Sequence, residues 1–311
     1  RSGPCSMGRW GTKGKAMDWF WSFPHLSDDF LRDLRRAIDD SFRTFTRSYG
    51  DMLEAFFDPL RIFLIQSERL MLNTPWPIVL LVIAAIAWFA SRSIWIVLGS
   101  VVTLFLIGMF DMWEDTMRTV SMIFVCTVIA IAVGIPLGIL MAKSDRVRNV
   151  INPILDVMQT MPSFVYLIPV VMLLGIGRVP GLIAVVIYAI PPIIRLTNLG
   201  IRLVDRDVLE AADAFGSSSW QKLKNVQLPL ALPTIMAGIN QTIMMALAMV
   251  VIASMIGVQG LGQPVLRAIN NQYFTLGVFN GLAIVGIAII FDRVSQAYGK
   301  RLPKHLEIVH G

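Results

Sequence analysis

The sequence has little charge, little cysteine and little histidine, and each shortage excludes a class of protein. Only 15% of its 311 residues are charged, whereas 55% are hydrophobic and the mean hydropathy is +0.66. A soluble domain carries charge on about a quarter of its residues. The composition therefore excludes an ordinary soluble domain and predicts that lipid surrounds most of the chain. The formal net charge of +6 lies mainly in loops between apolar runs, which is typical of membrane orientation rather than of nucleic-acid binding.

The sequence has few of the cysteine and histidine residues that metal binding and thiol chemistry use. The two cysteines, Cys5 and Cys126, form no CxxC spacing, and Cys126 lies inside an apolar run. We interpret Cys126 as a small buried hydrophobic residue rather than a redox group. The three histidines, His25, His305 and His310, all lie outside the apolar runs. The sequence therefore predicts no metal site, no cofactor and no catalytic residue on this chain, which argues against a membrane enzyme.

An energy source is also missing. The phosphate-binding motif GxxxxGK[ST] does not occur. Asp156 is the one acid expected inside a membrane span, so the chain lacks the pair of embedded carboxylates that a proton-coupled carrier would use. Uphill transport by this chain would therefore need a second protein that supplies the energy.

Long apolar runs dominate what is present. A membrane-spanning helix needs about 17–25 residues, so the first two runs are at the short limit. Only Ser91, Arg92 and Ser93 separate those two runs, which predicts a tight hairpin. The expected fold class is an all-α polytopic membrane protein with about seven transmembrane helices. These lie near residues 75–91, 94–110, 117–142, 151–176, 179–198, 230–257 and 275–292.

The two ends of the chain differ from its apolar middle. Residues 1–16 are glycine-rich and basic, contain no signal-peptide core, and are expected to be a disordered or tag-like extension ahead of Met17. Residues 17–74 are expected to form amphipathic helices on the external side, and residues 299–311 a cytoplasmic tail.

The amphipathic region has a clear helical period. Apolar residues recur at steps of three or four over residues 28–57, and Ser27 stands where an N-cap is needed. Pro59 is expected to end this helix, and a second amphipathic helix is expected to follow to about Asn73. Such helices lie on a membrane surface or pack against neighbouring helices.

The distribution of Lys and Arg predicts the orientation of the chain. Short loops rich in these residues face the cytoplasm. The loop at 143–149 is therefore assigned to the cytoplasm, together with the 195–227 loop and the C-terminus, whereas the acidic loop at 111–115 and the N-terminus lie outside. The cations on the cytoplasmic side are Arg92, Lys143, Arg146, Arg148, Arg195, Arg202, Arg206, Lys222, Lys224, Arg293, Lys300, Arg301 and Lys304, against Arg118, Arg178 and Arg267 in the opposite loops.

One polar stretch, EAADAFGSSSWQKLKNVQLPLALP at residues 210–233, interrupts the apolar sequence. A first helix is expected to end at Gly216, because glycine readily takes a positive φ. Ser218 and Gln221 have capping-box spacing for a second short helix. The Leu228–Pro229 pair is expected to end the compact knob that the two helices form, at the entry to the next span. Two amphipathic helices that keep apolar residues in water predict a docking surface for another protein.

This stretch resembles the EAA loop of ABC importer permeases. The family usually has Ile where Val226 stands. The resemblance extends over roughly residues 116–298 to the glycine betaine/proline betaine branch, the quaternary amine importers. It includes LDVMQTMPSFVYLIPVVMLLGIGRVPG (155–181) and MVVIASMIGVQGLGQ (249–263). The residues that carry the loop resemblance are Glu210, Ala211, Ala212, Gly216, Val226, Leu228 and Pro229.

The resemblance implies a type I importer permease. Its core of five helices would occupy residues 116–298, preceded by two additional helices at 75–115, and its coupling loop would occupy residues 199–229. That loop, with Trp220 among its docking residues, would contact a separate ATPase subunit that binds ATP and Mg. The implied assembly has two ATPase copies, a second permease copy and an external substrate-binding protein in a bacterial inner membrane, and it binds lipid but no nucleic acid.

The implied substrate is glycine betaine or proline betaine, with choline as a further candidate. Quaternary ammonium groups are held by aromatic faces, and in this family the high-affinity cage belongs to the binding protein. Polar groups inside a span usually face the bundle interior, so a translocation pathway is expected at Asp156, Gln159, Tyr166, Asn240 and Gln241. Hydrogen bonding between helices is the other interpretation of these residues.

An alternative function is a stand-alone secondary carrier or channel for cationic osmolytes. The missing pair of embedded acids and the long cytoplasmic stretch at 210–233 argue against it.

Overall fold

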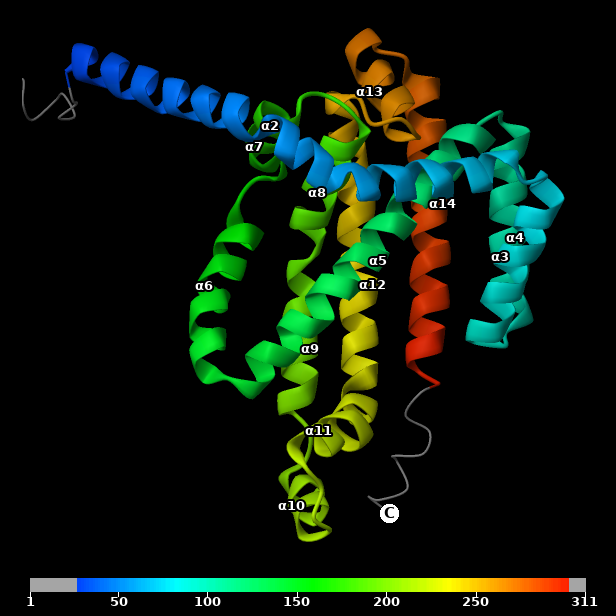
Figure 1. The fold of residues 1–311 in the computed structure, drawn as a ribbon. Helices are drawn as coiled ribbons and strands as arrows, with labels where there is room; N and C mark the ends of the chain where they lie inside the picture. The colour runs from blue at the N-terminus through cyan, green and yellow to red at the C-terminus, as the bar shows by residue number, and fades with distance from the viewer. Residues whose placement is uncertain (1–26, 302–311) are drawn as a thin grey trace, which may run out of the picture. The chain divides into compact units, whose positions relative to one another are not determined.

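We describe a computed structural model of the chain that places residues 27–301 (Figure 1). These residues are almost entirely helical, which confirms the expected all-α class. The chain divides into two compact units, residues 1–51 and 52–311, and each is described by itself. The expectations for residues 1–26, including the tag-like extension, and for residues 302–311 of the tail lie outside the described residues.

The amphipathic region forms one helix, α2 (Asp28–Asn73), rather than two. The Ser27 Oγ accepts a hydrogen bond from the Phe30 N–H at 3.4 Å, as expected of an N-cap. The prediction that Pro59 ends a helix is wrong. A proline removes its own N–H donor and kinks a helix, but the helix can continue where later turns are held by packing. Leu64, which follows in the same helix, is buried in the core of the second unit.

The first two apolar segments form the expected hairpin. Its helices are α3 (Trp76–Ser91) and α4 (Ile94–Met109). Arg92 adopts a left-handed φ of 48°, and its N–H donates to the Trp88 carbonyl at 2.8 Å. This bond closes the end of α3 and turns the chain toward α4.

The segment predicted as one span at 151–176 is broken. α6 (Asp145–Thr160) and α7 (Ser163–Leu174) meet at an angle of 103°. Met161 between them has an extended ψ of 134°. It precedes Pro162, and the proline ring disfavours the helical conformation in the residue before it. The sequence therefore contained the reason for the break.

The remaining helices complete the second unit. Four described helices are long and apolar enough to cross a membrane, or six if each bent pair counts as one span. Each of the seven predicted apolar segments falls on one helix or on two consecutive helices, whereas the sequence did not predict α13. The bounds are α5 (Trp113–Lys143), α8 (Arg178–Ala189), α9 (Pro191–Arg202), α10 (Arg206–Ala214), α11 (Ser219–Lys222), η1 (Leu223–Gln227), α12 (Leu228–Ala253), η2 (Ser254–Ile256), α13 (Gly262–Asn271) and α14 (Phe274–Gly299).

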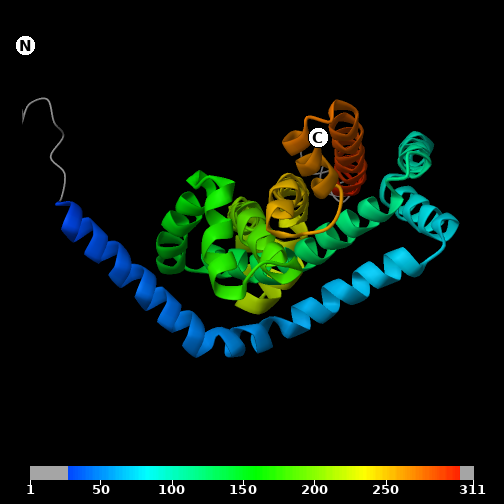
Figure 2. The same ribbon diagram turned by 90° about the horizontal axis from the view of Figure 1, so that it is seen from above.

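Small residues let α5, α9 and α12 approach closely at the centre of the second unit. A Cβ added to Gly138 of α5 would lie 2.6 Å from the Thr197 Cβ and 2.8 Å from the Ile194 carbonyl oxygen, both on α9. Close backbone approach through small residues is a general way of packing membrane helices. Helices α5, α8, α9 and α14 pack around α12, whereas α3 and α4 lie to one side of it (Figure 2). Along the bundle, α10 and α11 lie at one end and α13 lies at the other (Figure 1).

Candidate functional site

The polar stretch forms a projection at one end of the second unit, built from α10, α11 and the turn between them (Figure 1). Asp205 caps α10 by accepting a hydrogen bond from the Asp207 N–H at 3.0 Å. Gly216 ends it with a φ of 76°, and its N–H donates to the Asp213 carbonyl at 2.9 Å. A Cβ at Gly216 would meet nothing within 4 Å, so this glycine is needed for its backbone angle and not for space. The predicted glycine break is confirmed.

The predicted capping box at the start of α11 is also present. The Ser218 N–H donates to the Gln221 Oε1 at 2.8 Å, and the Gln221 N–H donates back to the Ser218 Oγ at 3.3 Å. The next span, α12, begins at Leu228, where the sequence analysis placed the end of the polar stretch, but no break separates it from α11. α11 continues through the wider π-helical turn η1 directly into α12. Pro229 lies in the first turn of α12, directly after the five-residue spacing of η1.

The projection is fastened firmly to the bundle. Leu223 is fully buried in a cluster with Ile201 of α9 and Ile235 of α12. The Lys222 Nζ donates to both carboxylate oxygens of Asp213 at 2.5 and 2.6 Å, which ties α11 to α10. A movement of the projection therefore has a rigid route into α12.

The end of α5 supplies further attachments. The Lys143 ammonium lies 5.7 Å from the centre of the Trp220 ring, within cation–π range. Arg202 of α9 donates to the Met141 carbonyl at 2.8 Å and to the Asp145 carboxylate at 2.7 Å. No local sequence pattern indicated these three contacts beyond the positive charge near the end of α5.

The outer surface of the projection carries exposed apolar side chains. Phe215 is 90% exposed and Trp220 is 64% exposed, and Val208 is exposed on the same two helices. No residue of α10 is buried. Burying one such side chain against a partner contributes about 1.5–3 kcal/mol. The projection therefore exposes apolar area that a bound partner would remove from water.

The residues of the sequence motif surround this surface. Glu210, Ala211 and Gly216 are exposed, and Ala212 is half-buried. The later motif residues Val226 and Leu228 are half-buried beside the bundle, and Pro229 is exposed at the start of α12.

The expected pathway residues separate into groups instead of converging on one cavity. Asp156 of α6 pairs with Arg195 of α9, and Gln159 is exposed. Tyr166 is buried and donates its hydroxyl proton to the Met158 carbonyl. Its ring lies 5.8 Å from that of Tyr188, edge to face.

Asn240 makes contacts between helices, as the other interpretation of the pathway residues predicts. Its Nδ2 donates to the Asp292 carboxylate of α14 at 2.9 Å, and its Oδ1 accepts from the Ser295 hydroxyl at 2.5 Å. Gln296 donates to the same carboxylate at 2.6 Å, whereas Gln241 is exposed. Asp292 corrects the expectation that Asp156 is the one acid inside a span. The sequence analysis missed it because the apolar segment was ended at that residue.

Metal binding finds no support in the part of the chain that the structure describes. Among residues 27–301, no group of three or more His, Cys, Asp or Glu side chains is placed to hold a metal ion.

Comparison with protein families decides the class of the chain. The family described as "Binding-protein-dependent transport system inner membrane component" matches residues 134–304, which is more than half of the sequence. The chain belongs to this family of inner-membrane permeases. The matched region contains the projection and α9, α12 and α14, whereas α2, α3 and α4 precede it.

Individual relatives match this permease over most of its length. It is 43% identical over 299 residues to the glycine betaine/proline betaine transport system permease protein of Escherichia coli, covering 93% of this chain and 84% of that protein. It is 45% identical over 278 residues to the glycine betaine/carnitine transport permease protein of Listeria monocytogenes, covering 88% and 94%. It is 42% identical over 263 residues to the glycine betaine transport system permease protein of Bacillus subtilis, covering 85% and 93%.

The fold of the permease is that of a type I ABC importer. A chain from the inward facing conformations of the MetNI methionine ABC transporter matches it with a TM-score of 0.55 and 19% sequence identity, covering 62% of this chain and 97% of that chain.

Proposed function

We propose that this permease is the membrane-spanning subunit of an ATP-driven, binding-protein-dependent importer of quaternary ammonium osmolytes, with glycine betaine or proline betaine as substrate. The observation that carries the proposal is the similarity to permeases of that name over nearly the whole chain. A relative from Bacillus subtilis named for glycine betaine, carnitine and choline is 30% identical over 59% of the chain, which keeps choline as a further candidate.

The exposed apolar surface of the projection is the part that would receive an ATPase subunit. In the proposed complex, two ATPase copies bind ATP and Mg and dock on the projections of two permease copies, and an external binding protein delivers the substrate. No ATP or Mg is assigned to this chain. The orientation that fits this arrangement has the projection and C-terminus in the cytoplasm and the N-terminus outside.

The helix that leaves the projection explains how docking could drive transport. α11, η1, α12 and η2 form one unbroken helical run, Ser219–Ile256, of 38 residues. Because a helix is stiff along its axis, a displacement of α11 by the ATPase moves α12, and α12 packs against α9, α8 and α14. The nucleotide cycle would thereby alternate the opening of the bundle between its two ends.

Docking can be tested by comparing two exposed phenylalanines at opposite ends of the bundle. Phe215 lies on the projection and Phe274, which is 82% exposed, lies at the start of α14. We expect Phe215→Ala to weaken ATPase binding by about tenfold or more, since a buried aromatic side chain contributes about 1.5–3 kcal/mol. Phe274→Ala should leave that affinity unchanged. Binding of the purified partner ATPase to permease in nanodiscs measures both, and equal affinities for the two variants would contradict docking at the projection.

A further inference from the structure

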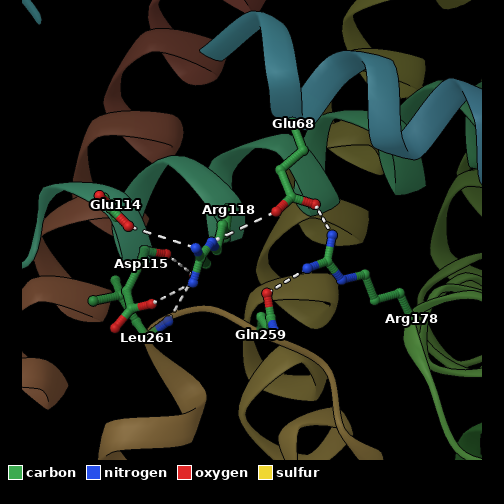
Figure 3. A network of polar contacts seen from close by, with 8 residues as sticks. Glu68, Glu114, Asp115, Arg118, Arg178, Gln259 and Leu261 are labelled. Carbon is green, nitrogen blue, oxygen red and sulfur yellow. Dashed lines mark hydrogen bonds and ion pairs between the residues drawn. The ribbon is translucent and has the colours of Figure 1, made fainter. Parts of the chain in front are cut away.

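A cluster of polar and charged residues joins four parts of the second unit that are distant in the sequence (Figure 3). We call it the Glu68 cluster and define it as Glu68 of α2, Arg118 of α5, Arg178 of α8 and Gln259 of the loop before α13. Arg178 Nη1 donates to the Glu68 Oε2 at 2.7 Å, and its Nη2 donates to the Gln259 Oε1. Arg118 Nε lies 3.5 Å from the Glu68 Oε1, an ion-pair distance without hydrogen-bond alignment.

The loop that carries Gln259 is itself held on α5. The Leu261 N–H donates to the Thr119 Oγ1 at 3.0 Å. Gly260 has a φ of 135°, and a Cβ there would lie 2.5 Å from the same hydroxyl oxygen. The start of α5, the start of α8 and this loop are therefore in direct contact at one place, with α2 lying over them (Figure 3).

The charge of Glu68 needs its ion-pair partners more than the charges of Arg118 and Arg178 need Glu68. Its side chain is 11% exposed, whereas those of Arg118 and Arg178 are 27% and 38% exposed. A carboxylate removed from water is unfavourable unless it is paired, whereas water can still solvate the two guanidinium groups. Arg118 also has Glu114 and Asp115 within 3.5 Å, so it keeps partners of its own if Glu68 leaves.

The packing around the carboxylate is close. Leu64, one turn before Glu68, is buried in the same core cluster as Met122 of α5 and Val258 of the loop. The cavity that these residues share with the Glu68 cluster has a volume of about 10 Å³, which is near the lower limit for one water molecule. Separating the ends of α5 and α8 would open this packed region and take at least one arginine away from Glu68.

We propose that Glu68 is a latch on the external mouth of the permease. It stabilises the state in which the outer ends of α5 and α8 and the 257–261 loop lie together, and opening of the mouth requires this carboxylate to leave at least one arginine. The surface helix α2 thereby takes part in gating through its residues 55–73. The inference rests on the alternating opening described under the proposed function.

The same helix offers a matched control. Asp58 pairs with Arg61 at 3.3 Å, but both side chains are about half exposed and lie on the surface of α2. An exposed pair of this kind contributes little. Asp58→Asn therefore removes one carboxylate from α2 without touching the Glu68 cluster.

The test uses the complete complex of permease, ATPase and binding protein in proteoliposomes, and it measures ATP hydrolysis without binding protein together with substrate uptake. We expect Glu68→Gln to raise hydrolysis in the absence of binding protein by about tenfold, because the outward-open state is populated without the signal that normally produces it. Stimulation by binding protein should fall in proportion. Asp58→Asn should behave as the wild type.

The double variant Glu68→Gln, Arg178→Gln separates a latch from simple structural support. It removes both charges, so it leaves no unpaired charge in the cluster while the connection stays broken. A latch predicts raised hydrolysis in the double variant as well as in Glu68→Gln. The proposal is overturned if the double variant recovers wild-type ATP hydrolysis and wild-type thermal stability. It is also overturned if the wild-type complex imports substrate but Glu68→Gln hydrolyses ATP at the same rate as Asp58→Asn. If the wild-type complex imports nothing, the proposed function fails and the latch fails with it.

Discussion

At the residue scale, Phe215 and Gly216 have different roles in the projection although they are adjacent. Phe215 is almost fully exposed and offers apolar area to a partner. Gly216 offers no area, but its left-handed backbone turns the chain from α10 into α11. In the proposed docking, the Phe215 side chain contributes to affinity and Gly216 allows the docking surface to form. Substituting Phe215 should therefore lower the affinity for a partner, whereas substituting Gly216 should destabilise the turn between α10 and α11.

Gly216→Ala should loosen the projection without affecting the bundle. An L-residue in the left-handed region costs about 1 kcal/mol or more. This cost corresponds to a roughly fivefold larger population of the open turn. Hydrogen exchange of the α10 and α11 amides measures this change.

Gly50 supplies a control position where alanine should have the opposite effect on stability. It also has nothing within 4 Å of an added Cβ, but it lies inside α2. Alanine stabilises a helix interior relative to glycine by about 0.5–1 kcal/mol. Gly50→Ala should therefore slow exchange locally. Equal effects at the two positions would contradict the conformational role of Gly216.

At the element scale, the proposed coupling depends on the junction between α11 and α12. The sequence analysis placed the end of the polar stretch at Leu228–Pro229, and the structure joins it to the span there through a continuous π-helical turn. A break would leave the projection as an independent knob, whereas continuity makes it the end of a spanning helix. The difference decides whether displacement at the docking surface reaches the core.

Softening this junction should uncouple the complex. Lys224 and Asn225 are exposed residues of η1. Replacing both with glycine costs about 1 kcal/mol per position relative to alanine, whereas replacing both with alanine removes the side chains and keeps the helix stiff. We expect the double-glycine variant to bind ATPase normally and to import severalfold less substrate per ATP hydrolysed. The double-alanine variant should retain wild-type coupling, and an equal loss in both variants would point to the side chains instead.

The sequence predicted those helix ends that depend on contacts between residues a few positions apart. The N-cap at Ser27, the capping box at Ser218 and the left-handed Gly216 each follow from one or two residues, and each is present. The continuation of α2 through Pro59 was not predictable in this way, since it depends on packing by later turns such as that of Leu64. The bend after α6 could have been predicted from Pro162.

At the scale of the whole molecule, the bundle has functional features at both ends. One end carries the proposed docking surface, whose exposed apolar side chains lie on a projection continuous with α12. The other end carries a partly buried charge cluster that joins α2, α5, α8 and the 257–261 loop. Contacts between residues as far apart as Glu68 and Arg178 cannot be derived from one sequence, because they depend on the packed arrangement of several helices. The pathway residues illustrate the same limit, since Asn240 was expected from its polarity but its partner Asp292 was not.

The central claim is that transport by this permease is driven through the projection by a separate ATPase. Uptake of radiolabelled glycine betaine into sealed vesicles tests it most directly, with the permease alone and then with the ATPase, the binding protein and ATP. The account predicts accumulation against a gradient only in the complete, ATP-supplied system, insensitive to ionophores and abolished when the ATPase cannot hydrolyse ATP. Concentrative uptake by the permease alone, driven by an ion gradient, would contradict it.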